Sequence, residues 1–74
     1  MQVEEAITLV AEEYGEATQK FGKFLSAHEG YAIIKEELEE LWDAIKYKEL
    51  GITEMTEEAK QLAAMALRFL VDIC

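Results

Sequence analysis

The chain is 74 residues long, which allows one domain, 1–74, and no second one. It carries 16 acidic and 7 basic residues, and this net charge of −9 excludes binding to a nucleic acid duplex or an anionic membrane through basic patches. No apolar run approaches the roughly 20 residues that cross a bilayer. The acidic N-terminus is unlike a secretory signal and Cys74 is the only cysteine, so a cytoplasmic protein without disulfides is expected.

The first element is an amphipathic helix. Its apolar residues recur at alternating steps of four and three, which places them in one stripe: Val3, Ile7, Val10, Tyr14, Ala17, Phe21 and Phe24. Gly15 weakens this helix in its interior and Gly22 frays its end.

The second helix begins at Ser26. Ser26 and Glu29 have the S-x-x-E spacing of a capping box, which satisfies free backbone amides at a helix start. An apolar stripe follows, made by Ile34, Leu38, Leu41 and Ile45. Gly51 suits the left-handed conformation that follows a helix end.

The third helix is expected to take Thr53 or Thr56 as its N-cap, with Glu57 and Glu58 near the positive end of the helix dipole. Its apolar stripe is Met55, Ala59, Leu62, Ala66, Phe69, Leu70 and Ile73. Small side chains would allow a close approach to a neighbouring helix: Ala63, Ala64 and Ala66.

The fold class is therefore all-α, with three antiparallel helices. The helices are more apolar than a three-helix unit needs, because Tyr31, Trp42 and Met65 lie off the stripes. So short a chain also buries little of its surface, and small domains often gain stability from a partner subunit. We expect a homodimer or homotetramer that completes a four-helix-type bundle.

The acidic residues of the second helix divide into two groups on a helical wheel. Glu36, Glu39 and Asp43 point away from the apolar stripe, towards solvent. Glu37 and Glu40 instead lie on the shoulder of the stripe. Half-buried carboxylates are unfavourable unless another group compensates their charge.

The third helix carries a matching polar pair. Glu58 and Gln61 lie on the corresponding shoulder, and antiparallel pairing would place Glu58 about 6 Å along the axis from Glu40. Mg²⁺ prefers such oxygen ligands, and facing helices of bundles often supply them. The alternative is that these acids only border the apolar core, as acid-rich helices often do.

These residues form a two-part motif. Glu36-Glu37-Leu38-Glu39-Glu40 reads E-E-x-x-E, and Glu58-x-x-Gln61 follows on the next helix. Over roughly residues 26–74 the chain resembles the MazG-like superfamily of all-α nucleoside triphosphate pyrophosphohydrolases, which carries E-E-x-x-E and then E-x-x-D. The resemblance implies Mg²⁺-dependent hydrolysis of (d)NTP to the monophosphate and pyrophosphate, with Mn²⁺ as a substitute metal.

The same resemblance implies roles for individual residues. Glu36, Glu37, Glu40 and Glu58 would be metal ligands, and Glu37 or Glu40 would be the catalytic base that acts on water. Gln61 stands where the family has Asp, so it would offer the metal a neutral carbonyl oxygen. We expect this change to lower metal affinity and to weaken the activity.

Three further residues are candidates for contact with the substrate. Arg68 and Lys46 could bind phosphate, although Arg68 could equally form a salt bridge with Glu37 or with an acid of a neighbouring subunit. Trp42 could stack on a base across a subunit interface, or it could simply pack there.

Two other functions are compatible with the sequence. One is a non-enzymatic helical oligomer that acts as a small interaction or regulatory protein. The other is an acidic mimic of nucleic acid that inhibits a DNA-binding protein. Metal-dependent stabilisation, self-association and competition with DNA distinguish the three.

Overall fold

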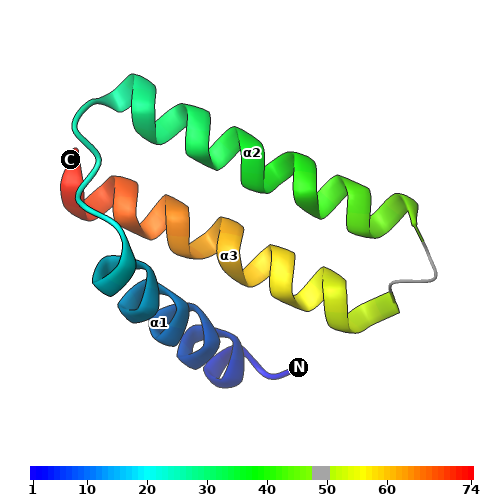
Figure 1. Cartoon of the computed structure of the whole chain (residues 1–74). Helices are drawn as coiled ribbons and strands as arrows, with labels where there is room; N and C mark the ends of the chain where they lie inside the picture. Colours follow the sequence, from blue (N-terminus) through cyan, green and yellow to red (C-terminus); the bar gives the residue numbers. More distant parts are fainter. Residues whose placement is uncertain (48–50) are drawn as a thin grey trace.

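The computed structural model describes residues 1–47 and 51–74, and within them every regular element is a helix. The helices are α1 (Val3–Lys20), α2 (Ala27–Lys46) and α3 (Gly51–Asp72) (Figure 1). The expected all-α class with three helices is confirmed. Among the described residues, none of the helices is both long and apolar enough to span a bilayer.

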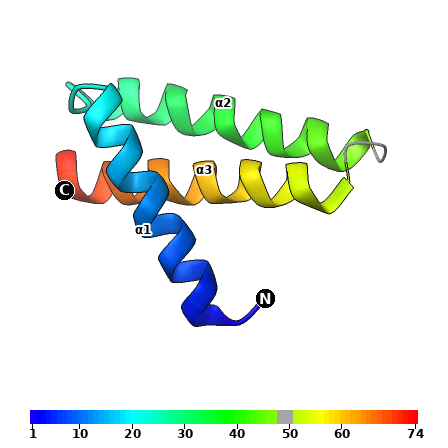
Figure 2. The ribbon, with the colours of Figure 1, turned by 60° about the horizontal axis from the view of Figure 1, so that its bottom comes forward.

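The central helix is α3, because both other helices pack against it and not against each other. α2 runs antiparallel to α3 along its whole length, so the two form a layer (Figure 1). α1 crosses α3 on one face of that layer (Figure 2). The molecule is elongated, with extents of 36 × 25 × 19 Å.

The start of α2 is a capping box, as the sequence predicts. The hydroxyl of Ser26 accepts a hydrogen bond of 3.1 Å from the Glu29 amide. The Glu29 carboxylate reaches back and accepts one of 3.1 Å from the Leu25 amide. Both bonds satisfy amides that a helix start would otherwise leave free.

The predicted end of the first helix is wrong. α1 stops at Lys20, and Phe21 is extended. Phe21 and Phe24 therefore do not continue a helical stripe. Both lie in the connection between α1 and α2, residues 21–26, where Phe21 is 61% exposed and Phe24 is 6% exposed. The Phe24 amide donates to the Asp72 carboxylate at 3.0 Å, which fixes the connection to the end of α3.

The start of α3 also differs from the expectation. Gly51 has the expected positive φ, +72°, but it is the first residue of α3. Thr53 and Thr56 therefore lie inside the helix, and the Thr56 hydroxyl donates to the Ile52 carbonyl at 2.8 Å instead of capping. Glu54 occupies the first turn in place of the two expected acids, Glu57 and Glu58.

The core lies where α1, α2 and the connection meet α3. Its buried members are Ala17, Phe24, Ala64 and Met65, with Tyr14, Ile33, Ile34, Phe69 and Ile73 packed against them. Ala64 is fully buried (0% exposed) in this core, as expected for a residue at a helix contact. Ala66, by contrast, is exposed.

The two stripes that the sequence assigns to the core are buried only in part. Ile34, Phe69 and Ile73 pack against the core, whereas the exposed members are Leu38 and Ile45 of α2, and Ala59, Ala66 and Leu70 of α3. At about 100° per residue, these exposed residues project from the side of the α2–α3 layer that α1 does not cover. Tyr31, Trp42 and Ile52 project from the same side, and we call the whole exposed set the uncovered face.

We predict that Gly30→Ala destabilises the fold. A Cβ at Gly30 would lie 2.6 Å from Cδ2 of Phe69 and 3.1 Å from Cδ2 of Phe24. Moving these rings should lower the free energy of unfolding by about 1–3 kcal/mol, although alanine is the better helix former. Urea unfolding measures the change.

Gly15→Ala is the matched control, because a Cβ there meets no atom within 4 Å. It should stabilise α1 by roughly 0.5–1 kcal/mol. Equal stabilisation by both substitutions would show that the space at Gly30 is not required.

Candidate metal centre and adjoining cleft

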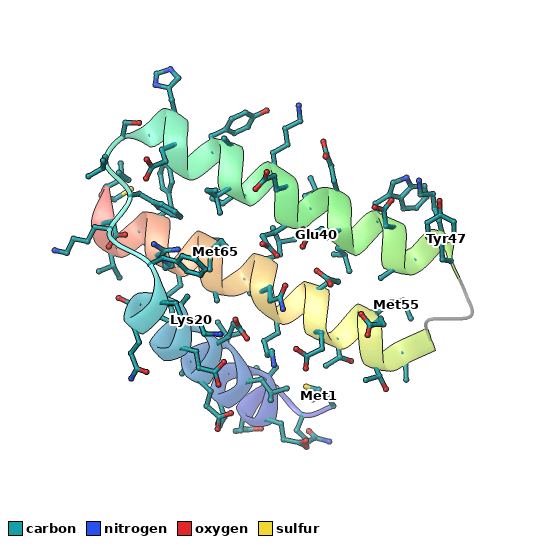
Figure 3. All side chains as sticks on the ribbon, in the orientation of Figure 1. Met1, Lys20, Glu40, Tyr47, Met55 and Met65 are labelled. Atoms are coloured by element: carbon teal, nitrogen blue, oxygen red, sulfur yellow. The ribbon has the colours of Figure 1, made fainter. Side chains whose placement is uncertain are left out.

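Three carboxylates from two helices converge at the middle of the α2–α3 layer. Glu37 and Glu40 come from α2 and Glu58 comes from α3, and one oxygen of each lies within 4.8 Å of the others. Glu40 projects from α2 into the space between the two helices (Figure 3). We call these residues the glutamate trio.

Helix geometry explains the convergence. Glu37 and Glu40 are three residues apart, so they share one side of α2, and antiparallel pairing brings Glu58 of α3 opposite them. Glu36 projects further round α2, is exposed and does not belong to the trio. The structure thus brings together three of the four predicted carboxylate ligands.

The three carboxylates of the trio repel one another and are partly buried without a compensating charge. Glu37 Oε2 and Glu58 Oε2 are buried without a hydrogen-bond partner among the described residues. Burial, then the charges of Glu40 and Glu58, raise the pKa of Glu37 to about 7. Burial, then the hydrogen bond with Glu40 and its charge, raise the pKa of Glu58. In residues 1–47 and 51–74 no lysine or arginine forms an ion pair with the trio.

This environment fits a divalent cation. The donors are all carboxylate oxygens, which Mg²⁺ and Mn²⁺ prefer. Two of the oxygens are orphaned and buried, so they lack the compensation that a cation would supply. The donor set of the trio is therefore compatible with a divalent cation.

A cleft of about 860 Å³ adjoins the trio on the side where α1 lies. Its walls come from α1, the connection after it, α2 and α3. The residues that line it include Lys20, Lys23, Phe24, Glu36, Glu37, Gln61 and Arg68. Glu37 belongs to both the trio and the cleft, so a ligand could contact both at once. Its volume is typical of a site for a small molecule or nucleotide.

Gln61 lines this cleft, three residues after Glu58 on α3. It is half-buried, and Glu36 and Glu37 line the cleft with it. Its side chain therefore borders the space next to the trio, where the sequence places it.

Arg68 lines the cleft as well, but the suggested salt bridge to Glu37 is absent from the described residues. Arg68 is only 4% exposed. Its Nη2 donates to the Gly22 carbonyl at 2.6 Å, and its guanidinium lies 4.3 Å from the centre of the Phe24 ring. It therefore fastens the connection while it contributes a positive charge to the cleft.

Lys46 and Trp42 do not reach the cleft. Lys46 pairs with Asp43 at 3.4 Å and lies 5.7 Å from the Trp42 ring centre, near the far end of α2. Trp42 is 56% exposed on the uncovered face. Within one chain, neither residue is placed to touch a ligand that lies in the cleft.

Sequence reasoning missed the part of the site that the first helix supplies. Lys20 and Lys23 line the cleft, but they lie at the end of α1 and in the connection, where no motif marks them. The only available signal was that basic residues gather at positions 20 and 23 in an otherwise acidic chain.

No protein-family model, curated protein or solved structure matches the chain. Its function is therefore inferred from the trio, the cleft and their charges, together with the sequence motif.

We predict that stability falls with rising pH because of Glu37. The pKa of this carboxyl is about 7 in the folded chain and near the ordinary 4.5 in the unfolded chain. Between these values the folded state binds more protons, so the free energy of unfolding should fall as pH rises, by roughly 1–3 kcal/mol in EDTA. Urea unfolding at a series of pH values measures this.

Glu37→Gln should make the free energy of unfolding depend less on pH between 4.5 and about 7. Glu39→Gln is the control, because it removes an equal charge from an exposed position of α2. Parallel stability curves for the two variants would contradict the assignment of the effect to Glu37.

Proposed function

We propose that the protein is a Mg²⁺-dependent nucleotide pyrophosphohydrolase that converts (d)NTP to (d)NMP and pyrophosphate. The observation that carries this proposal is the glutamate trio, with two orphaned carboxylate oxygens, at the edge of a cleft of nucleotide size. The resemblance to the MazG-like motif supports it. A cytoplasmic location would give the enzyme access to the nucleotide pool.

Glu37, Glu40 and Glu58 would hold the metal. Glu36 and Gln61 would lie beside it, where they line the cleft with Glu37. When bound, Mg²⁺ or Mn²⁺ would neutralise triphosphate charge and favour attack on phosphorus. With Gln61 in place of an acid, the centre has three carboxylates, so weak metal binding and modest turnover are expected.

Glu37 or Glu40 would act as the base. A water oxygen attacks the α-phosphorus, its proton passes to the carboxylate, and the bond from the α-phosphorus to the bridging oxygen breaks. Pyrophosphate leaves with the electron pair of that bond.

Self-association through the uncovered face is part of the proposal. Leu38, Trp42 and Leu70 are 53%, 56% and 62% exposed there, and monomers rarely expose apolar patches of more than a few hundred Å². A second copy packed against this face would give a four-helix bundle from two α2–α3 layers. A homodimer or homotetramer is therefore proposed.

The same face favours a second candidate function. A chain that uses the α2–α3 layer only for assembly would be a non-enzymatic helical oligomer, a small interaction or regulatory protein. Gln61 agrees with this alternative, because it leaves the centre with one carboxylate fewer than the family motif.

We predict pyrophosphate release from a panel of NTPs and dNTPs. Release should require Mg²⁺ or Mn²⁺ and stop in EDTA. Glu40→Gln and Glu58→Gln should each lower kcat about a hundredfold or more, because each removes a metal ligand or base. A coupled pyrophosphate assay measures the rates.

Glu39→Gln is the control for charge, since Glu39 is exposed and outside the trio. It should retain the rate of the unsubstituted protein. No release from any nucleotide by a folded protein would favour the non-enzymatic oligomer, and equal rates in all variants would contradict a role for the trio.

We predict that Leu38→Glu weakens self-association. A carboxylate in the middle of the uncovered face would be buried without a partner, so the dissociation constant should rise about tenfold or more. Sedimentation velocity over a range of concentrations measures this. Ile7→Glu, at a 63% exposed site of α1, is the matched control. A monomeric parent protein at every concentration would contradict the proposed assembly.

A further inference from the structure

Arg68 is a buried cation with no acidic partner among the described residues. It is 4% exposed, and its Nε atom makes no hydrogen bond. Its other contacts are the Gly22 carbonyl, the Met65 sulfur at 3.4 Å and the Phe24 ring. A guanidinium stays charged in proteins, and a buried charge without a counter-ion is unfavourable. This residue therefore points to an anion in the cleft that it lines.

Two lysines reinforce the positive charge at the same place. Lys20, at the end of α1, and Lys23, in the connection, are exposed and line the cleft with Arg68. Figure 3 shows Lys20 near Met65, whereas Glu40 lies further along the α2–α3 layer. The cleft thus has a cationic end, made by Lys20, Lys23 and Arg68, and a carboxylate end at the trio.

Five carboxylates also line the cleft: Glu13, Glu16, Glu29, Glu36 and Glu37. Glu13 forms an ion pair with Lys60 at 3.6 Å, which offsets its charge. Glu29 accepts a hydrogen bond from the Leu25 amide at 3.1 Å but keeps its charge. An incoming phosphate would therefore depend on direct contact with the three cations, and on Mg²⁺ at the trio to offset the carboxylates there.

The two ends are separated along α3: Arg68 follows Glu58 of the trio by ten residues, about 15 Å along the helix axis. A metal ion at the trio, a triphosphate and the long Arg68 side chain would together bridge this separation. The guanidinium fork suits phosphate oxygens, and flexible lysines at the rim can follow them.

We propose that the cationic end binds the two terminal phosphates of the nucleoside triphosphate, which leave as pyrophosphate, while the α-phosphate lies at the trio. The identity of this ligand rests on the proposed function. This orientation places the nucleoside at the trio end of the cleft, away from the three cations. Binding should therefore depend on the phosphates and discriminate weakly among bases.

Isothermal titration of inorganic pyrophosphate into the full chain with Mg²⁺ tests the proposal. The double substitution Lys20→Met/Lys23→Met should raise the Kd for pyrophosphate about tenfold. Lys35→Met, which removes an exposed charge outside the cleft, should leave it unchanged. Arg68→Met should have the larger effect, and circular dichroism checks its fold because it also loses the Gly22 contact.

A nucleoside monophosphate is the second probe, and the lysine pair should not change its affinity. Equal pyrophosphate binding by the lysine pair and Lys35→Met would overturn the proposal. So would a selective loss of monophosphate affinity, because the nucleoside would then occupy the cationic end. If Arg68→Met unfolds, the test rests on the pyrophosphate Kd of the Lys20→Met/Lys23→Met variant compared with that of Lys35→Met. Absence of turnover would overturn the proposed function but not this result, since the heat of binding needs no hydrolysis.

Discussion

The structure depends on α3 packing against two partners at once. α2 and α1 approach it from different directions, and Ala64 is fully buried in the core that these elements form. A small side chain at a buried position permits close packing of helices. The flank of α3 that carries Ala64, Met65 and Arg68 is turned inward, and part of the more apolar stripe, Ala59, Ala66 and Leu70, is left exposed.

The same pairing places like charges together. Once α2 lies along α3, Glu37, Glu40 and Glu58 must meet, because all three project towards the facing helix. Apolar contacts around Phe24, Met65 and Phe69 hold the layer, and the trio opposes it unless a proton or a cation compensates the charge. A cation that bound only the folded trio would therefore stabilise the fold.

Sequence patterns predicted the helices, the Ser26 capping box and the inward direction of Glu37, Glu40 and Glu58, because these depend on spacing within one or two helices. They predicted the buried faces only in part: Ala17, Ile34 and Phe69 belong to the core or pack against it. Leu38, Ile45 and Leu70 are instead exposed. Hydrophobic periodicity reports the most apolar face, and this chain uses that face only in part for its own core. Arg68 was predicted as a phosphate contact, but Lys20 and Lys23 were missed, because they join Arg68 only when the connection folds over α3.

The geometry separates assembly from ligand binding. The cleft lies on the side of the α2–α3 layer that α1 crosses, whereas the uncovered face lies on the other side. A second copy bound to the uncovered face would bury Trp42 and Leu38 and leave the cleft open. Base stacking by Trp42 across that interface therefore conflicts with a substrate that lies in the cleft. Association would act on the trio indirectly, by holding together the two helices that supply it, so an enzyme and a stable oligomer are compatible uses of one layer.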